Sequence, residues 1–343
     1  METKDILKDL VKINTIQDKY NKEFIDYIEN YLIQLGFKTE SKTKNLVMSY
    51  GANYGLGFLG HSDTVEYIDG WKTNPHDLVE KDGILYGLGS SDMKGGIAAF
   101  LKAIKETDLN NLKRGIKVYI TYDEEIGFKG IKEVVDNEVA YPEYMIFGEP
   151  TNNIECTACK GLLSFKLYTT GIKVHSSRTD RGKSANTSMI KLLNELEDYY
   201  NKEIKVKETN IYEVPYTTMN IGLLNGGSAI NSVAASCYSY VDFRLSFKEH
   251  RDMLIKKVEE LCSKYDGRYE IDDNILPFDN NVEFIKEKNS ASFMTEASFI
   301  EQTKRIILGV GPVTAHEIDE HIEISSLEKL VDQYKEIITK TCN

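Results

Sequence analysis

The stretch GFLGHSDTV at residues 57–65 decides how the rest of the chain can be interpreted. Residues 55–60 form a short apolar run that predicts a buried strand, and the polar residues His61 and Asp63 follow it directly. Alternate residues of an extended segment share a face, so both side chains can point the same way from the carboxyl end of this strand. In an open α/β sheet that end binds ligands. One interpretation is a metal-binding imidazole with its orienting carboxylate, and the alternative is a strand that ends in a polar turn.

Two later strands end in acidic residues in the same manner. The apolar run 116–122 leads into DEEIG at 123–127, and residues 144–147 precede GEPT at 148–151. Between the first strand and these two, a glycine-rich loop, YGLGSSDMKGG at 86–96, opens a predicted helix. Strands that alternate with helices predict a largely parallel, doubly wound α/β sheet. We therefore expect three strands to deliver imidazole and carboxylate groups to one edge of this sheet.

The other elements of this domain are predicted from apolar spacing and from turn residues. The segment 69–83 has the composition of surface turns. We expect helices over 3–12, 17–34, 97–105, 284–288 and 325–340, and strands over 37–39, 45–49, 84–86 and 305–308.

A second pattern begins near Gly161. Its predicted elements follow the order βαββαβ, which is the ferredoxin-like α+β arrangement. They are a strand over 162–170, a helix over 185–200, strands over 217–224 and 234–245, a helix over 248–264 and a strand over 268–271. Because this pattern starts and finishes inside the chain, we expect an inserted domain over 161–273 and a first domain built from 1–160 and 274–343.

Size and composition restrict the class of protein. A chain of 343 residues is long enough for two domains. The net charge of −12 argues against nucleic acid and anionic membrane surfaces as main partners. The N-terminal residues lack the pattern of a signal peptide, and no stretch has the length of a membrane span. Five cysteines at irregular spacing, including a lone CxxC at Cys156 and Cys159, are interpreted as buried thiols of a reducing, cytoplasmic location.

Five residues from these strand ends and loops form a set of mixed nitrogen and oxygen donors: His61, Asp92, Glu125, Glu149 and His316. Zinc takes such donors, usually four to a site. Five side chains can serve two ions if one carboxylate bridges, and the ions can then hold one hydroxide. Each residue also has an ordinary alternative: Asp92 could cap the following helix, Glu125 could lie in a solvated turn and His316 in a polar loop. Cobalt or manganese would suit the same donors.

The motifs HSDTV at 61–65, YGLGSSDMKGG at 86–96, DEEIG at 123–127, GEPT at 148–151 and AHEIDEHIE at 315–323 occur in this order. They resemble the metal-site motifs of the acetylornithine deacetylase and succinyl-diaminopimelate desuccinylase family of di-zinc deacylases and exopeptidases. The resemblance runs from about residue 5 to residue 340. It implies a di-metal catalytic domain, 1–160 with 274–343, and an inserted dimerisation or lid domain, 161–273.

The resemblance also implies how the ligands divide. One zinc would be bound by His61, Asp92 and Glu149, and the other by Asp92, Glu125 and His316, with Asp92 as the bridge.

Two neighbours of these ligands have implied roles of their own. Asp63 would orient His61, and Glu124 would be the general base rather than a ligand. The peptide bond from Asp92 to Met93 is expected to be cis.

Three residues of the inserted domain resemble family residues that contact the substrate. His175, in VHSS at 174–177, would reach the active site of a neighbouring subunit and stabilise the tetrahedral oxyanion. Asn231 and Arg244 would bind the substrate carboxylate, for which the fork of an Arg is suited. The resemblance therefore implies a homodimer through the inserted domain. From the residues alone, His175 could be a turn residue and Arg244 a member of a surface ion pair.

Four stretches resemble most closely the members that hydrolyse acetylornithine, among them VPYTTMNIGLLNGGSAINSVAASC at 214–237 and MTEASFI at 294–300. In the latter, we place Glu296 near the cationic end of the substrate. The expected reaction is hydrolysis of N2-acetyl-L-ornithine to L-ornithine and acetate. Succinyl-diaminopimelate, acetyl-lysine and small peptides remain alternative substrates, because the chain departs from the familiar enzymes at Val65-Glu66 and around Asn231. A metal-binding protein without catalytic activity is the remote alternative.

Overall fold

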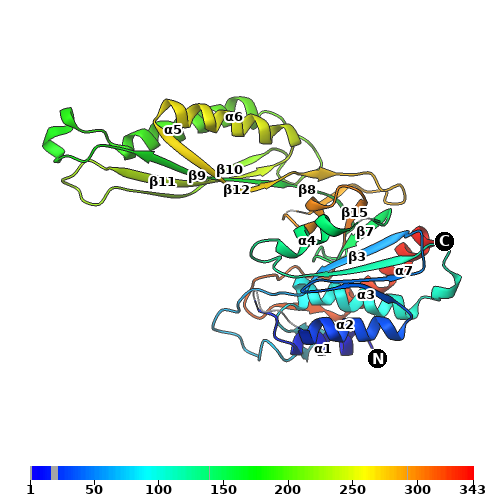
Figure 1. Ribbon diagram of the computed structural model, residues 1–343. Helices are drawn as coiled ribbons and strands as arrows, with labels where there is room; N and C mark the ends of the chain where they lie inside the picture. Colours follow the sequence, from blue (N-terminus) through cyan, green and yellow to red (C-terminus); the bar gives the residue numbers. More distant parts are fainter. Residues whose placement is uncertain (1, 17–21, 139, 292) are drawn as a thin grey trace. The chain divides into compact units, whose positions relative to one another are not determined.

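The computed structural model describes residues 2–16, 22–138, 140–291 and 293–343 (Figure 1). The chain divides into two compact units. The first comprises Met1–Thr157, Asn280–Asn289 and Thr295–Asn343, and the second comprises Ala158–Asp279 and Ser290–Met294. Among the described residues, no helix combines the length and the apolar composition that crossing a bilayer requires.

The first unit is built on one large, mostly parallel sheet. Its central strands lie in the order β6, β3, β7 and β15, and each pairs in parallel with its neighbour. The strands β2 and β8 flank them in antiparallel pairings, and β1 extends the sheet beyond β2. The bounds are β1 Lys38–Lys42, β2 Leu46–Tyr50, β3 Leu56–His61, β6 Ile116–Thr121, β7 Tyr144–Phe147, β8 Cys156–Cys159 and β15 Lys304–Ile307.

Helices cover both faces of this sheet. Four of them share one apolar core with the sheet and lie on the same side of it in Figure 1: α1 Thr3–Lys12, α2 Lys22–Gln34, α3 Gly95–Glu106 and α7 Ile324–Cys342. The helix α4, Lys129–Asn137, lies on the opposite side. Buried side chains at helical spacing, such as Leu7 and Leu10 of α1, explain why these helices pack here. The predicted doubly wound α/β class is confirmed.

A small second sheet in the first unit holds together two segments that are distant in the chain. It consists of β16 His321–Glu323, β5 Ile84–Tyr86 and β4 Val79–Lys81, in that order. The antiparallel pairing of His321 with Tyr86 therefore places the loop before β16 beside the glycine-rich loop after β5.

The second unit is a four-stranded antiparallel sheet with the order β10, β11, β9, β12. With two helices between the strands, this is the ferredoxin-like βαββαβ topology. Inward and outward side chains alternate along β9, and α5 and α6 cover the inward face (Figure 1). The bounds are β9 Gly161–Thr170, α5 Ala185–Tyr199, β10 Thr218–Gly226, β11 Ser236–Leu245, α6 Lys248–Lys264 and β12 Gly267–Ile275.

Several details differ from the sequence prediction. The helix expected over 284–288 is absent: these residues form turns and irregular chain, in which Phe284 and Ile285 pack against the first core. Two adjacent apolar residues are too few to define a helical face, so the prediction was wrong. The helix α4, the strand β4 and the strand β8, which contains the CxxC, were not predicted. Residues 17–21 of the helix expected over 17–34 lie outside the described residues.

Candidate metal centre

The candidate site lies at the carboxyl ends of the four parallel strands of the first unit. Because the strands are parallel, the residues that follow them meet at one edge of the sheet. The turn η1, Ser90–Lys94, adds Asp92 just before α3. Across the sheet, β6 leads to Glu124 and Glu125, β3 ends at His61, β7 leads to Glu149 and β15 leads to the loop with His316.

The first group of possible ligands contains His61, Asp92 and Glu149. One atom from each lies within 4.8 Å of the others. His61 Nε2 is 3.0 Å from Asp92 Oδ1 and 3.9 Å from Glu149 Oε1. The imidazole and the Glu149 carboxylate are almost completely buried, so few water molecules can solvate the charges that face each other.

The second group contains Asp92, Glu125 and His316, again within 4.8 Å of one another. His316 Nε2 is 3.0 Å from Glu125 Oε2 and 3.6 Å from Asp92 Oδ2. Asp92 therefore belongs to both groups and turns one carboxylate oxygen to each imidazole. Its peptide bond to Met93 is cis.

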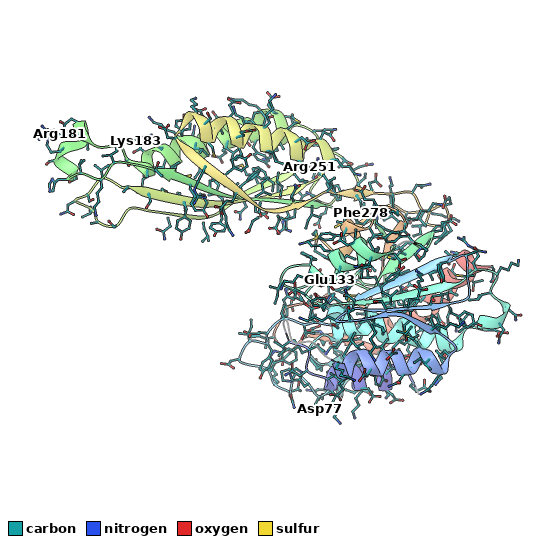
Figure 2. The ribbon with its side chains drawn as sticks, viewed as in Figure 1. Asp77, Glu133, Arg181, Lys183, Arg251 and Phe278 are labelled. Carbon is teal, nitrogen blue, oxygen red and sulfur yellow. The ribbon has the colours of Figure 1, made fainter. Side chains whose placement is uncertain are left out.

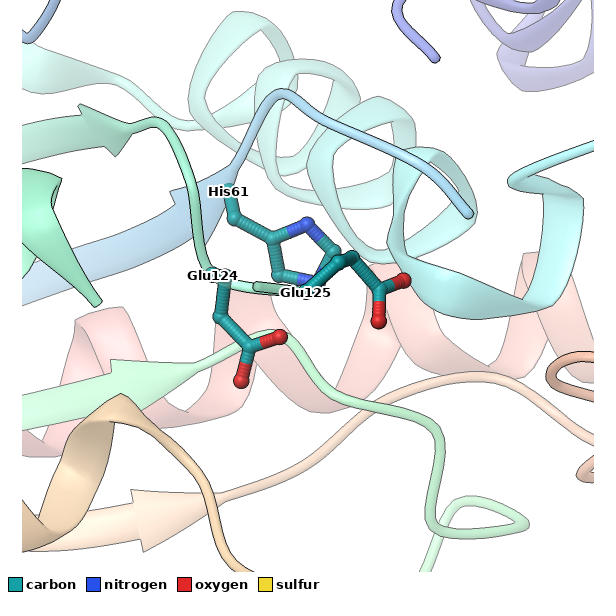
Figure 3. A group of neighbouring side chains, drawn as sticks. All are labelled: His61, Glu124 and Glu125. Atoms are coloured by element: carbon teal, nitrogen blue, oxygen red, sulfur yellow. The ribbon is translucent and has the colours of Figure 1, made fainter. Parts of the chain in front are cut away.

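Glu124 lies beside these groups. It forms a third cluster with His61 and Glu125, within the same limit of 4.8 Å. Figure 3 shows the ring of His61 next to the two carboxylates, which extend from consecutive residues after β6. Consecutive residues in this loop thus supply one carboxylate to the second ligand group and a second carboxylate beside His61.

Asp63 contacts His61 in a different way from a simple carboxylate–imidazole pair. The nearest partner of His61 Nδ1 is the backbone oxygen of Asp63, at 2.9 Å, whereas the carboxylate oxygen Oδ1 is 3.8 Å away. The other carboxylate oxygen, Oδ2, accepts the backbone N–H of Glu125 at 3.1 Å. If Nδ1–H donates to the carbonyl, Nε2 presents its lone pair to the site, as a metal ligand must. Asp63 also positions Glu125, which the sequence did not predict.

The charges of the site are unbalanced. Burial raises the pKa of Glu149 and of Glu124 well above the ordinary range, and the neighbouring carboxylates raise both further. Burial also raises the pKa of Glu125. For His61, burial opposes protonation, but the hydrogen bond to Asp92 and the charges of nearby carboxylates raise its pKa well above the usual value. The hydrogen bond to Glu125 raises the pKa of His316 to about 9.

These properties fit a bound cation. Carboxylates that are buried beside one another are costly unless a positive charge compensates them. Glu125 Oε1 and Asp63 Oδ1 are buried and have no hydrogen-bond partner within the described part of the chain. Imidazole nitrogen and carboxylate oxygen are donors that zinc and related divalent ions accept. The residues present therefore match what a metal centre requires.

Glu296 lies within the first unit and close to this centre. It is 1% exposed, and Oε2 accepts a hydrogen bond of 2.9 Å from the hydroxyl of Thr121, the last residue of β6. Oε1 is buried without a partner within the described residues. Burial raises the pKa of Glu296 to about 8.

The other predicted site residues belong to the second unit. His175 begins the short turn η3, Ser176–Arg181, and its Nδ1 lies 2.8 Å from Ser177 Oγ. The turn ends at Arg181, which is labelled with Lys183 in Figure 2. The N–H of Ser176 donates to the backbone oxygen of Asn231 at 3.0 Å, so the segments of His175 and Asn231 are adjacent.

Arg244 lies on β11 in the second unit. Its side chain is 46% exposed, and Nε donates to Asp242 Oδ1 at 3.3 Å. It also lines a cavity of about 190 Å³ together with Lys160 and Tyr212. The guanidinium is therefore accessible to a ligand, although it already has one carboxylate neighbour in its own strand.

Sequence reasoning missed one residue that contacts the site. Glu320 is buried, and its carboxylate accepts the backbone N–H of Asp92 at 3.0 Å. It lies inside the motif AHEIDEHIE, four residues after His316. Nothing in the sequence distinguishes it from the exposed Glu317 and Glu323 of the same motif, because only the tertiary structure brings it to the glycine-rich loop.

A buried cluster of imidazoles and carboxylates at the carboxyl edge of a doubly wound sheet is the type of site that metal-dependent hydrolases use. The chain belongs to peptidase family M20/M25/M40, whose model matches residues 57–340. It is therefore an enzyme of the hydrolase class, as the motifs predicted.

Individual relatives agree with this assignment. The chain is 32% identical to an acetylornithine deacetylase of Pasteurella multocida, over 94% of this chain and 91% of the relative. It is 30% identical to an acetylornithine deacetylase of Proteus mirabilis, over 95% and 91% of the two chains. A tripeptidase of Staphylococcus aureus has the same fold, with a TM-score of 0.80 at 22% identity over 99% and 97% of the chains. A dinuclear metal binding peptidase of Bacillus subtilis shares it with a TM-score of 0.72 at 11% identity, over 99% and 98%.

Proposed function

We propose that the protein is a dinuclear metal amidohydrolase that removes the acyl group of an N-acyl amino acid, with N2-acetyl-L-ornithine as the favoured substrate. The observation that carries this proposal is the position of Asp92 between two imidazole–carboxylate groups, with Glu124 beside them. The relatives that share about 30% identity over most of the chain support acetylornithine as the substrate.

The proposed ligands are His61, Asp92 and Glu149 for one ion and Asp92, Glu125 and His316 for the other. Zinc is the proposed metal, and cobalt or manganese are possible substitutes because the donor set suits all three. When bound, such ions lower the pKa of a coordinated water and polarise a carbonyl group.

Glu124 is the proposed proton carrier. Its carboxylate takes the proton of the attacking water and later delivers it to the nitrogen of the leaving amine, so that the amine departs as a neutral group. Burial raises the pKa of Glu124, which favours the protonated form that delivers the proton to the leaving amine. Asp63 keeps His61 in the tautomer that presents Nε2 to the site.

Two residues of the second unit are proposed to hold the substrate carboxylate. Arg244 offers the two parallel N–H groups of its guanidinium, and Asn231 offers a side-chain amide. The exposure of Arg244 in a cavity supports this role.

A panel of N-acyl amino acids, assayed with added zinc or cobalt, tests the proposed function. Acetylornithine should give the highest kcat/KM, followed by related acyl amino acids with a basic side chain. The tripeptidase-like fold makes small peptides the second candidate, so tripeptides and dipeptides belong in the same panel. Preferential cleavage of peptides with a free amino group would replace the deacetylase proposal by a peptidase.

His175 is proposed to act in the neighbouring subunit of a homodimer formed through the second unit. Its exposed position at the start of η3, away from a core, supports a role in contacts outside its own unit. Mixing His175→Ala with Glu124→Gln should restore activity well above that of either variant, because one of the two mixed sites then has both residues. Sedimentation of a fully active monomer would contradict both the dimer and the shared site.

Glu296 is proposed to face the cationic end of the substrate, through the buried oxygen Oε1 that lacks a partner within the described residues. Burial raises the pKa of the Glu296 carboxyl to about 8, and a cationic group beside it would favour the charged form. Gln keeps the shape but cannot take on this charge. We expect KM for acetylornithine to rise, with little change for an acyl amino acid that has a neutral side chain. If the substitution changes KM for neither substrate, Glu296 does not belong to the substrate site.

The proposed location is the cytoplasm. All five cysteines are buried and none forms a disulfide, which suits a compartment without disulfide formation. Fractionation of cells with an antibody against the protein would test this, and recovery outside the cytoplasmic fraction would overturn it.

A further inference from the structure

Glu320 is a buried carboxylate that the proposed mechanism does not use. Its side chain is enclosed in the first unit, with 2% exposure, and both oxygens accept backbone N–H groups. Oε2 accepts from Gly89 at 2.8 Å, and Oε1 accepts from Ser91 at 2.8 Å and from Asp92 at 3.0 Å. One carboxylate thus binds three donors within four consecutive residues, and the last of them is the shared candidate ligand.

The turn that holds Asp92 depends on an acceptor from elsewhere in the fold. Asp92, with φ −122° and ψ 96°, and Met93, with φ −131° and ψ 28°, both depart from helical backbone inside this turn. The N–H groups of Gly89, Ser91 and Asp92 lie at the start of this turn, where no earlier helical carbonyl can accept them, and a buried N–H without a partner is costly. The Glu320 carboxylate accepts these N–H groups and so fixes the backbone from which the Asp92 side chain extends.

The same carboxylate joins the loops of two ligands. Glu320 lies four residues after His316, and its own backbone oxygen accepts the N–H of Gly87 at 3.0 Å. On the other side of His316, the N–H of Thr314 donates to Ser91 Oγ at 3.3 Å. The loop of His316 is therefore bonded to the loop of Asp92 both before and after its ligand.

We propose that Glu320 is a positioning residue that holds Asp92 between the two ligand groups, so that its loss weakens metal binding at both positions together. This inference rests on the proposed metal centre. It follows from geometry, because the two carboxylate oxygens of Asp92 face different imidazoles, at 3.0 Å from His61 Nε2 and 3.6 Å from His316 Nε2. Loss of a residue that serves one group, such as Glu149, should weaken one position far more than the other.

The substitution Glu320→Gln tests the proposal at constant side-chain size. An amide replaces one oxygen by a donor, so at least one of the three N–H groups meets another donor instead of an acceptor. Zinc is titrated by calorimetry into the full-length protein after chelation. Both binding steps should weaken by about 10- to 100-fold, the usual range for residues that support a ligand. Glu149→Gln should affect mainly one step, and Glu323→Gln, at an exposed position of the same motif, should affect neither.

The outcomes separate this inference from the proposed function. Wild-type protein that binds no zinc would overturn the metal centre itself, whatever Glu320 does. Wild-type affinity at both steps in a folded Glu320→Gln variant would overturn the positioning role. A lower unfolding midpoint of the metal-free variant, with unchanged zinc affinity, would likewise assign Glu320 a purely structural role.

A second variant covers the case in which Glu320→Gln does not fold, as judged by circular dichroism. Glu320→Asp keeps the charge but withdraws the carboxylate by one methylene, so both zinc steps should weaken relative to the wild type. Unchanged affinity of this variant would contradict the proposal, because the three short bonds to the glycine-rich loop require the full length of the side chain.

Discussion

Replacing Glu124 with Gln should leave the metal content of the protein unchanged and lower kcat by a factor of about 10² to 10⁴, the usual contribution of a general base. Gln keeps the size of the side chain but cannot take a proton from water. Because Glu124 is proposed to lie outside both ligand groups, the ions should remain. The measurements are steady-state kinetics with acetylornithine and metal analysis of the dialysed variant.

Two results would reassign the residue. Turnover close to that of the wild type would show that another group carries the proton. If the variant loses an ion as well as its activity, Glu124 is a metal ligand. Its position in one cluster with His61 and Glu125 makes this role geometrically possible. The matched control is Glu301→Gln, an exposed glutamate of the first unit, which should change neither kcat nor metal content.

Removing the metal with a chelator should abolish hydrolysis and should destabilise the protein more at pH 8 than at pH 6. The pKa values of Glu124, Glu149 and Glu125 are raised in the metal-free fold, mainly by burial, and that of Glu296 is raised to about 8. Between the ordinary carboxyl pKa of about 4.3 and these raised values, the folded state binds more protons than the unfolded state. Linkage then requires its stability to fall as the pH rises through this interval.

The histidines act in the same direction. His316, with its pKa raised to about 9, is protonated in the folded protein at a pH where an unfolded histidine is neutral. A bound cation compensates the carboxylates in place of these protons. The metal-bound protein should therefore lose less stability between pH 6 and pH 8 than the metal-free protein. Thermal unfolding with and without zinc at several pH values measures the difference. A metal-free protein that is as stable at pH 8 as at pH 6 would contradict the charge balance described for this site.

Much of the fold was predictable because the pattern is local. Apolar runs such as 116–122, each followed by polar residues, predicted the parallel strands, and βαββαβ spacing predicted the topology of the second unit. The elements that were missed carry weak local signals. The strand β8 is a short segment with two cysteines. The helix α4 follows a polar turn whose acidic residues indicate a functional site and not the start of a helix.

The site was predictable for a different reason. His61, Glu124, Glu125 and Glu149 each follow a strand closely, so knowledge of parallel strands was enough to place them at one edge. Asp92 and His316 lie in loops, and their assignment came from motifs rather than from spacing. Their proximity in the fold, 3.6 Å between His316 Nε2 and Asp92 Oδ2, depends on contacts that no local pattern describes.

The sequence by itself determined the class of fold, the family and the donor types, because these follow from periodicity, motif order and side-chain chemistry. Only the tertiary structure decided how each donor is held. The backbone oxygen of Asp63 contacts His61 Nδ1, and the Asp63 carboxylate accepts the N–H of Glu125. The Glu320 carboxylate accepts the N–H of Asp92. The physical reason is that one partner of each such hydrogen bond is a backbone group, and in the case of Glu320 the side chain that accepts it is more than 200 residues away. A backbone N–H or carbonyl is the same at every residue, so its partner is defined only when the chain is folded.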